Sequence, residues 1–355
     1  MQESNSKMSR FFSEKLRIVS FLSIIIVFYM HTGFPDSVKE NMMLPVLLRG
    51  CIVGVLGRCA VPMFFAISGY LFFYNVKNGL KDVLAKMKKR VKTLFVPFVI
   101  AALFFPAFFV IMKLIPGASS YVNSDSYMDK VMTMPVKDVL TALFYDCGNG
   151  APWAYHLWFL RDLIIIVAIT PLIYYFRKWM GGWSAMVIFV LYLLFPDLSI
   201  LYSLFWFVSG GCMLDKLDKF PKWCYIAFFV LFLILSAYQQ IVGFKIWLNI
   251  KIIVVSLGLV SLWGGYDILV SKEFELKKAP LLNFACQFTF FLYLYHEPAI
   301  HIIVKGFPLA LGSNAFGYTM SFLLSPLVFL PVGISIGYLL RKHTPSFYKV
   351  IVGGR

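Results

Sequence analysis

The chain has little charge. Of its 355 residues only 14% are Asp, Glu, Lys or Arg, whereas 60% are hydrophobic. Soluble domains carry about 25% charged and about 45–50% apolar residues. This composition excludes an ordinary soluble domain and predicts a membrane protein. No basic domain stands apart from the apolar runs, so the net charge of +16 does not indicate a nucleic-acid-binding protein.

Signals of several other classes are missing. The six Cys residues form no CxxC pair, so neither a disulfide framework nor a zinc site is predicted, and we expect no metal. Lys15 and Arg17 lead into the first apolar run as in a signal peptide, but no A-x-A site follows, and we expect a retained helix. The sequence has no internal repeat, low-complexity tract or soluble second domain. We therefore expect residues 1–355 to form one membrane-embedded domain.

Apolar runs bounded by charge, Gly or Pro predict about ten transmembrane helices, each close to the length of about 20 residues that a bilayer requires. Their ranges are 16–34, 50–73, 93–115, 154–175, 182–196, 198–213, 223–242, 246–268, 281–304 and 316–340. With the N-terminus inside, most Lys and Arg residues fall in cytoplasmic segments, so we expect both termini in the cytoplasm. The predicted fold is an all-α polytopic bundle.

The longest predicted outer loop is 116–153, with a short amphipathic piece at 131–146. Connections of this length usually carry function or disorder. A lid, an acceptor-side surface and a purely structural connection are all compatible with it.

Ionisable side chains inside the predicted spans are the strongest functional signal. They are His31, Arg58, Arg161, Asp162, His296 and Glu297. At a rise of about 1.5 Å per residue, the histidines and arginines all lie in the outer half of the hydrocarbon layer. Such groups are costly in lipid, so we expect them to meet in one polar cavity. The alternative is that Arg161–Asp162 and His296–Glu297 are ordinary polar contacts between helices.

Among these residues His31 is the best candidate general base, because a neutral imidazole can take a proton from a hydroxyl at physiological pH. Arg58 and Arg161 stay charged when buried and suit an oxyanion or a carboxylate. His296 completes the predicted catalytic set.

A basic stretch at 77–92, KNGLKDVLAKMKKRVK, contains seven Lys and Arg residues and leads into an apolar run. One interpretation is a topological anchor that contacts anionic lipid. The other is a phosphate site for a nucleotide-bearing donor, with Lys89, Arg90 and Lys92 at its mouth.

Three more residues are candidates for supporting the site. Ser68 and Tyr70 flank Gly69 in AISGYLFF, where small residues predict a close approach of two helices. Trp158 lies near an outer boundary, where an interfacial aromatic belt is the alternative interpretation.

Six stretches together resemble the acyltransferase 3 family of bacterial membrane acyltransferases, which includes O-acetyltransferases of O-antigens and exopolysaccharides. In order they are LRIVSFLSIIIVFYMH, GRCAVPMFFAISGYLFF, KKRVKTLFVPF, HLWFLRDLIIIVAITPL, LFWFVSGGCMLDK and FTFFLYLYHEPAI. They cover residues 16 to about 300, within a core of about 16–340.

The resemblance implies an O-acyltransferase of the bacterial inner membrane. It would move an acyl group, most often acetyl, from cytoplasmic acetyl-CoA to a hydroxyl of a surface polysaccharide or lipid-linked sugar. His31 matches the essential first-helix histidine, and Arg58 matches the basic residue before the VPxFFxISG segment. Arg161 and His296 match positions that shape the site.

The basic pair associated with the CoA phosphates is matched by Arg90 with Lys89 and Lys92. One position departs from the family, because many members have an Arg eleven residues before the histidine, where this chain has Ser20.

Two other functions remain open from the residues alone. A proton-coupled secondary transporter also uses intramembrane His, Arg and carboxylate groups, although the paired repeats of many transporters are not visible here. A polysaccharide export component is the second alternative. Turnover of a thioester without a gradient distinguishes the enzyme from the transporter. Deletion of an export component would remove the surface polysaccharide, whereas deletion of an acetyltransferase would leave a polymer that lacks acetyl groups.

Overall fold

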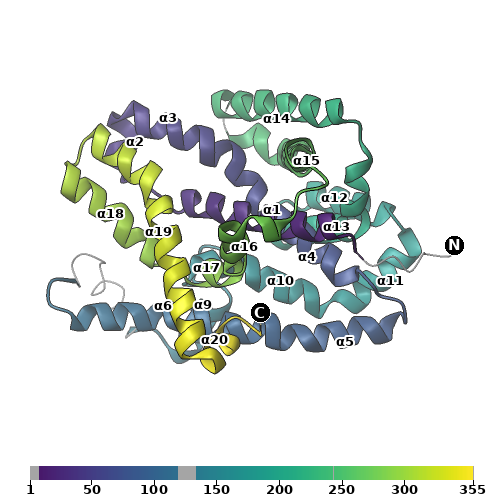
Figure 1. Ribbon diagram of the computed structural model, residues 1–355, viewed down its shortest axis with the longest axis horizontal. Helices are drawn as coiled ribbons and strands as arrows, with labels where there is room; N and C mark the ends of the chain where they lie inside the picture. Colours follow the sequence, from purple (N-terminus) through teal and green to yellow (C-terminus); the bar gives the residue numbers. More distant parts are fainter. Residues whose placement is uncertain (1–7, 119–132, 243, 355) are drawn as a thin grey trace. The chain divides into compact units, whose positions relative to one another are not determined.

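The structure is a computed structural model that describes residues 8–118, 133–242 and 244–354. This part of the chain is helical and contains no β-strand (Figure 1). In hydrocarbon a helix satisfies every backbone N–H and C=O group internally, which is why an apolar chain of this kind folds into helices. The all-α fold class predicted from the sequence is confirmed.

The chain divides into two compact units. Unit 1 comprises Met1–Met30, Val46–Val76 and Tyr175–Thr289, and unit 2 comprises His31–Pro45, Lys77–Tyr174 and Phe290–Arg355. Each unit is built from segments that are distant in the sequence. The expectation of one domain over 1–355 stays a prediction.

The helices of unit 1 are α1 (Arg10–Met30), η1 (Ile52–Gly57), α4 (Arg58–Phe73), α12 (Trp183–Leu194), α13 (Ser199–Met213), η4 (Leu214–Lys219), α14 (Lys222–Val242), α15 (Phe244–Leu269), η5 (Leu276–Lys278) and α16 (Pro280–Cys286). Those of unit 2 are α2 (Asp36–Asn41), α5 (Leu80–Arg90), η2 (Val91–Phe95), α6 (Val96–Leu114), α9 (Val136–Phe144), η3 (Tyr155–Leu157), α10 (Trp158–Ala168), α18 (Ala299–Leu311), α19 (Ala315–His343) and α20 (Pro345–Ile351). Three helices cross a unit boundary: α3 (Met43–Cys51), α11 (Thr170–Met180) and α17 (Thr289–Tyr295).

Six helices within the described residues are long and apolar enough to cross a membrane. They are Met43–Phe73, Leu80–Leu114, Ser199–Lys219, Lys222–Gln239, Ile250–Leu269 and Ala315–His343. A seventh span results if the bent pair Tyr155–Ala168 and Thr170–Met180 counts as one. The chain is therefore a multi-pass membrane protein, whereas the count of ten spans and the cytoplasmic termini stay predictions.

Besides the bent pair, three of the predicted spans are not among these six helices. The span 182–196 corresponds to α12, which has only 12 residues. The span 16–34 corresponds to α1, which begins at Arg10 and includes Glu14, Lys15 and Arg17, so this helix is not among the six. The predicted span 281–304 consists of α16, α17 and the start of α18, three short helices with breaks between them. In the predicted outer loop, residues 119–132 lie outside the described part, and α9 corresponds to the expected amphipathic piece.

The close helix approach predicted around Gly69 is present in unit 1. A Cβ atom built on Gly69 of α4 would overlap the carbonyl group of Phe207 in α13, and one on Gly210 would overlap Ala66. The two helices therefore pack with their backbones in contact, which only residues without a Cβ allow here. Ser68 and Tyr70 flank this contact, and the ring of Tyr70 packs against Phe12 with centroids 5.1 Å apart.

A buried ion cluster also stabilises unit 1. The side chain of Lys15 is 0% exposed, and its Nζ donates to Asp218 at 2.7 Å and to Asp267 at 2.6 Å. The Nζ atom also lies 4.2 Å from the centre of the Trp263 ring, whose Nε1 donates to Asp218 at 2.7 Å. A fully buried ammonium group is stable only with such partners, so Lys15 fixes α1 to η4 and α15.

Candidate active site

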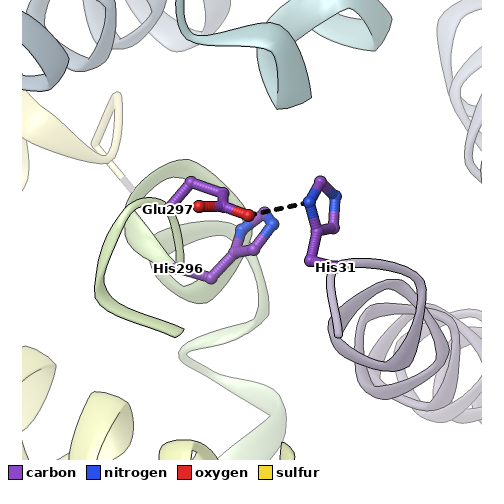
Figure 2. Close-up of side chains that lie close together, drawn as sticks. All are labelled: His31, His296 and Glu297. Carbon is purple, nitrogen blue, oxygen red and sulfur yellow. Dashed lines mark ion pairs between the residues drawn. The ribbon is translucent and has the colours of Figure 1, made fainter. Parts of the chain in front are cut away.

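His31 lies directly after the last residue of α1, in a turn, and belongs to unit 2. Its side chain is only 12% exposed. Its Nδ1 atom is 2.8 Å from Oε1 of Glu297 and 2.8 Å from the hydroxyl of Tyr155. The residue singled out as the general base is thus held by a carboxylate from a distant part of the sequence (Figure 2).

Glu297 and His296 come from the break between α17 and α18. Helix α17 ends at Tyr295 and α18 begins at Ala299, because Pro298 has no N–H group and disfavours helical backbone before it. Both side chains point toward His31 (Figure 2). Irregular backbone within a membrane is tolerated where it is buried in protein or lines a cavity, and His296 and Glu297 at this break are both buried.

Several side chains of the cluster contact the same atom, Oε1 of Glu297. Oε1 of Glu297 accepts a hydrogen bond from the Tyr155 hydroxyl at 2.7 Å and lies 3.1 Å from Nε2 of His301. The Tyr155 hydroxyl is also 3.1 Å from that nitrogen. The Glu297 side chain is 0% exposed, and a buried carboxylate requires such donors.

His296 contributes a ring rather than a second charge. Its Nδ1 atom is 2.9 Å from the carbonyl of Tyr293, so this nitrogen carries the proton and Nε2 is the unprotonated one. The ring is fully buried and packs against His31, with centroids 4.7 Å apart. On its other side it packs against buried His156 at 4.9 Å. Together these rings fix the orientation of His31.

The three ligand atoms of His31, His296 and Glu297 lie within 4.8 Å of one another, which is also compatible with a bound cation. The contacts of Glu297 Oε1 with Tyr155, His31 and His301 are each satisfied by a proton on the partner atom. We therefore interpret the cluster as hydrogen-bonded, and the expectation of no metal stays a prediction.

Arg161 is a buried residue of α10, the helix that directly follows η3 with Tyr155 and His156. Its N–H groups donate to a neighbouring loop. Nη1 donates to the carbonyls of Tyr145 at 2.7 Å and Gly150 at 2.9 Å, while Nε and Nη2 donate to Asp162. Arg161 therefore holds the segment 145–150, and Asp162 orients the Arg161 guanidinium group. Trp158 is the half-buried first residue of the same helix.

Hydrogen bonds within the loop 145–150 also fix its conformation. The carboxylate of Asp146 accepts hydrogen bonds from the backbone N–H groups of Gly148, Asn149 and Gly150 at 2.8, 3.0 and 2.8 Å. These hydrogen bonds, with that of Gly148 the largest contribution, hold the pKa of Asp146 below its usual range. The loop before Tyr155 is therefore a fixed turn.

The predicted donor residues lie at the junction of α5 and η2. Lys89 and Lys92 are exposed, and Arg90 is half-buried. Arg90 and Lys88 border a groove of about 410 Å³ whose other lining is apolar and comes from α5, η2 and α10 of the same unit. A basic rim above an apolar groove suits a ligand that has phosphate groups and an extended chain.

Arg58, Ser68 and Tyr70 belong to unit 1. Arg58 is the first residue of α4, directly after the π-helical turn η1, and is half-buried. Its predicted convergence with His31 stays a prediction.

Sequence reasoning missed Tyr155, His156 and His301, which contact the predicted residues. The sequence does hold a signal for His301, because it follows Glu297 by four residues, the spacing that places two side chains on one helix face. Tyr155 and His156 carry no such signal, since their hydrogen bonds to other parts of the site span 124 or more positions of sequence.

Histidines in contact with a buried carboxylate, within an apolar helical protein, are suited to proton transfer inside a membrane protein. Residues 14–342 match the acyltransferase 3 family, described as an acyltransferase domain. The chain belongs to this family and is an acyltransferase, as the sequence motifs predicted. The family assignment gives the transporter and export alternatives no support.

The chain is also similar in sequence to a curated protein. The chain is 22% identical over 317 residues to the succinoglycan biosynthesis protein ExoH of Rhizobium meliloti (strain 1021), a similarity that covers 84% of this chain and 80% of the relative. No solved structure matches the chain.

Proposed function

We propose that the protein is an O-acyltransferase of the bacterial inner membrane. It transfers an acyl group, in the first instance acetyl, from cytoplasmic acyl-CoA to a hydroxyl of a cell-surface polysaccharide or lipid-linked sugar. The observation that carries the proposal is the contact of 2.8 Å between Nδ1 of His31 and Oε1 of the fully buried Glu297.

In this mechanism His31 is the general base. Nδ1–H of His31 donates to Glu297, so the other ring nitrogen, Nε2, is free to accept a proton. Nε2 takes the proton of the acceptor hydroxyl while the hydroxyl oxygen attacks the thioester carbonyl. The carboxylate orients the ring and stabilises the imidazolium ion that forms, the same task that the acid performs in a Ser-His-Asp triad. Collapse of the tetrahedral intermediate then gives the ester and the CoA thiolate.

The donor is assigned to the basic rim of unit 2. Lys89, Arg90 and Lys92 would bind the phosphates of acyl-CoA, and the apolar groove beside Arg90 would take the pantetheine arm. The chain supplies positive charge and an apolar wall at adjacent positions, as this donor requires.

The remaining residues support the reaction. We assign the developing oxyanion to Arg58, because a guanidinium group stays charged in an apolar setting. His296 sets the orientation of His31. Arg161 positions the loop that precedes Tyr155 and thereby shapes the acceptor side.

The proposed acceptor rests on analogy with the curated relative. The name of that relative assigns it to succinoglycan biosynthesis, and we infer by analogy that this chain acts on a bacterial polysaccharide or its lipid-linked precursor.

Membranes from cells that express the wild type or His31→Ala, given radiolabelled acetyl-CoA, test the proposal. We expect label in the glycan fraction with the wild type only, at equal protein levels. Equal labelling by His31→Ala would remove His31 from the mechanism. Neutralising Lys89, Arg90 and Lys92 together should raise the apparent KM for acetyl-CoA; an unchanged KM would mean that these residues are a lipid anchor.

A further inference from the structure

His301 is the exposed member of an otherwise buried cluster. Its side chain is 41% exposed, against 12% for His31 and 0% for Glu297. Nε2 of His301 lies 3.1 Å from Oε1 of Glu297 and 3.1 Å from the hydroxyl of Tyr155. Of the described side chains that contact this carboxylate oxygen, His301 has the largest exposed fraction.

The outer side of His301 faces a polar environment. His301 lies in the first turn of α18, and Lys305, four residues later on the same face, is exposed. An exposed ammonium group on that face indicates water or polar headgroups rather than hydrocarbon, because a charge facing lipid is costly. His301 therefore lies between the buried carboxylate and an exposed, charged position of the same helix.

The buried pair of His31 and Glu297 also needs a route by which a proton can leave. After each transfer, a proton from the acceptor hydroxyl remains on His31, whose ring is nearly inaccessible to solvent. Until that proton leaves, His31 cannot act as a base again.

We propose that His301 is a proton-transfer residue, through which the proton taken up by His31 reaches water. The inference rests on the proposed function. His31 gains the hydroxyl proton at Nε2 and releases the proton on Nδ1 to the carboxylate of Glu297. Glu297, directly or through the Tyr155 hydroxyl, passes a proton to His301, which releases it to water. The imidazole ring of His31 then turns, so that its protonated nitrogen again faces Glu297 and its free nitrogen faces the next acceptor hydroxyl.

The proton balance closes without another reactant. Acyl-CoA and the hydroxyl give an ester, a CoA thiolate and one proton. The C–S bond breaks and the C–O bond forms, the proton leaves through His301, and the thiolate takes a proton from water or buffer. In the competing route, His31 returns its proton directly to the thiolate, and His301 has no part in turnover.

The test compares two substitutions of His301 in full-length protein in native membranes, with radiolabelled acetyl-CoA and the endogenous glycan. His301→Ala removes the carrier and leaves space for a small molecule. His301→Gln keeps an N–H donor for Glu297 but cannot carry a proton. His343→Ala, which changes an exposed histidine in the last turn of α19, is the matched control.

We expect both His301 variants to lose about ten-fold in rate, added imidazole to restore His301→Ala but not His301→Gln, and His343→Ala to match the wild type. Normal rates in His301→Ala would overturn the proposal, as would full activity of His301→Gln, since a hydrogen bond alone would then suffice. Loss of rate in both variants without any response to imidazole would also overturn it.

The two proposals fail in different ways. If His31→Ala stays active, the proposed base is wrong. If His31→Ala is inactive while His301→Ala is normal, only the proton path is wrong.

Discussion

The charge of Glu297 makes the sharpest quantitative prediction. Glu297→Gln keeps the shape of the side chain and an oxygen that accepts a hydrogen bond, but removes its negative charge. At the observed 2.8 Å, unit charges in a medium with an effective dielectric constant of about 20 attract by about 6 kcal/mol. If half of the imidazolium charge has developed in the transition state, the variant loses about 3 kcal/mol of stabilisation, or about 100-fold in kcat.

The assay is the initial rate of acetyl transfer from radiolabelled acetyl-CoA in membranes with matched protein levels. Because the contact acts after the donor is bound, we expect the KM for acetyl-CoA to stay the same. Glu275→Gln is the matched control, since Glu275 forms an ion pair with Arg10 in unit 1, and its rate should equal that of the wild type. A rate for Glu297→Gln close to the wild-type rate would refute the electrostatic role of this carboxylate.

Three further predictions concern stability. Lys15→Met leaves two carboxylates without their shared cation and should cost about 3 kcal/mol of unfolding free energy, measured by thermal unfolding in detergent; an unchanged midpoint would contradict the ion cluster. Gly69→Leu should cost about 1–3 kcal/mol, whereas Gly265→Leu, with nothing within 4 Å of its Cβ, should be tolerated, and equal melting curves would refute the close helix contact. The lowered pKa of Asp146 means that its carboxylate stabilises the turn at and above its usual value of 3.8 and loses this effect as the pH falls through the lowered value. Hydrogen exchange at 148–150, corrected for chemical rate, should therefore lose protection only below that usual value; loss near neutral pH would contradict this.

Much of the site could be predicted from the sequence, because ionisable residues in an apolar chain are rare and expensive. This rarity identifies His31, His296 and Glu297 as candidate site residues, and the structure brings them together. Composition alone was sufficient for the all-helical class, since hydrocarbon permits little else.

The partners of these residues could not be predicted in the same way. Tyr155 is an ordinary residue in an aromatic-rich stretch, and only the fold brings its hydroxyl to Glu297, 142 positions away. The hydropathy pattern predicts one continuous helix across 296–298, because apolar residues flank this segment on both sides. Pro298 was the local signal that a single span was interrupted.

Charge near the end of a span was the least reliable signal. Lys15 reads as a cytoplasmic basic residue before the first apolar run, yet it is buried between two aspartates from distant helices. The sequence predicts that Arg161 binds an oxyanion or a carboxylate, and its N–H groups donate to the Asp162 carboxylate and to two loop carbonyls. In both cases the partner decides the role, and sequence spacing does not show the partner.

The central claim is that this protein acylates a surface glycan with His31 as the base. The most direct measurement is the NMR signal of acetyl esters on surface polysaccharide from cells with the intact gene, a deletion, and His31→Ala at matched membrane levels. The account predicts that the polymer persists in all three strains and that the acetyl signal is present with the intact gene only. An unchanged acetyl signal in the deletion strain, or a full signal with His31→Ala, would contradict it.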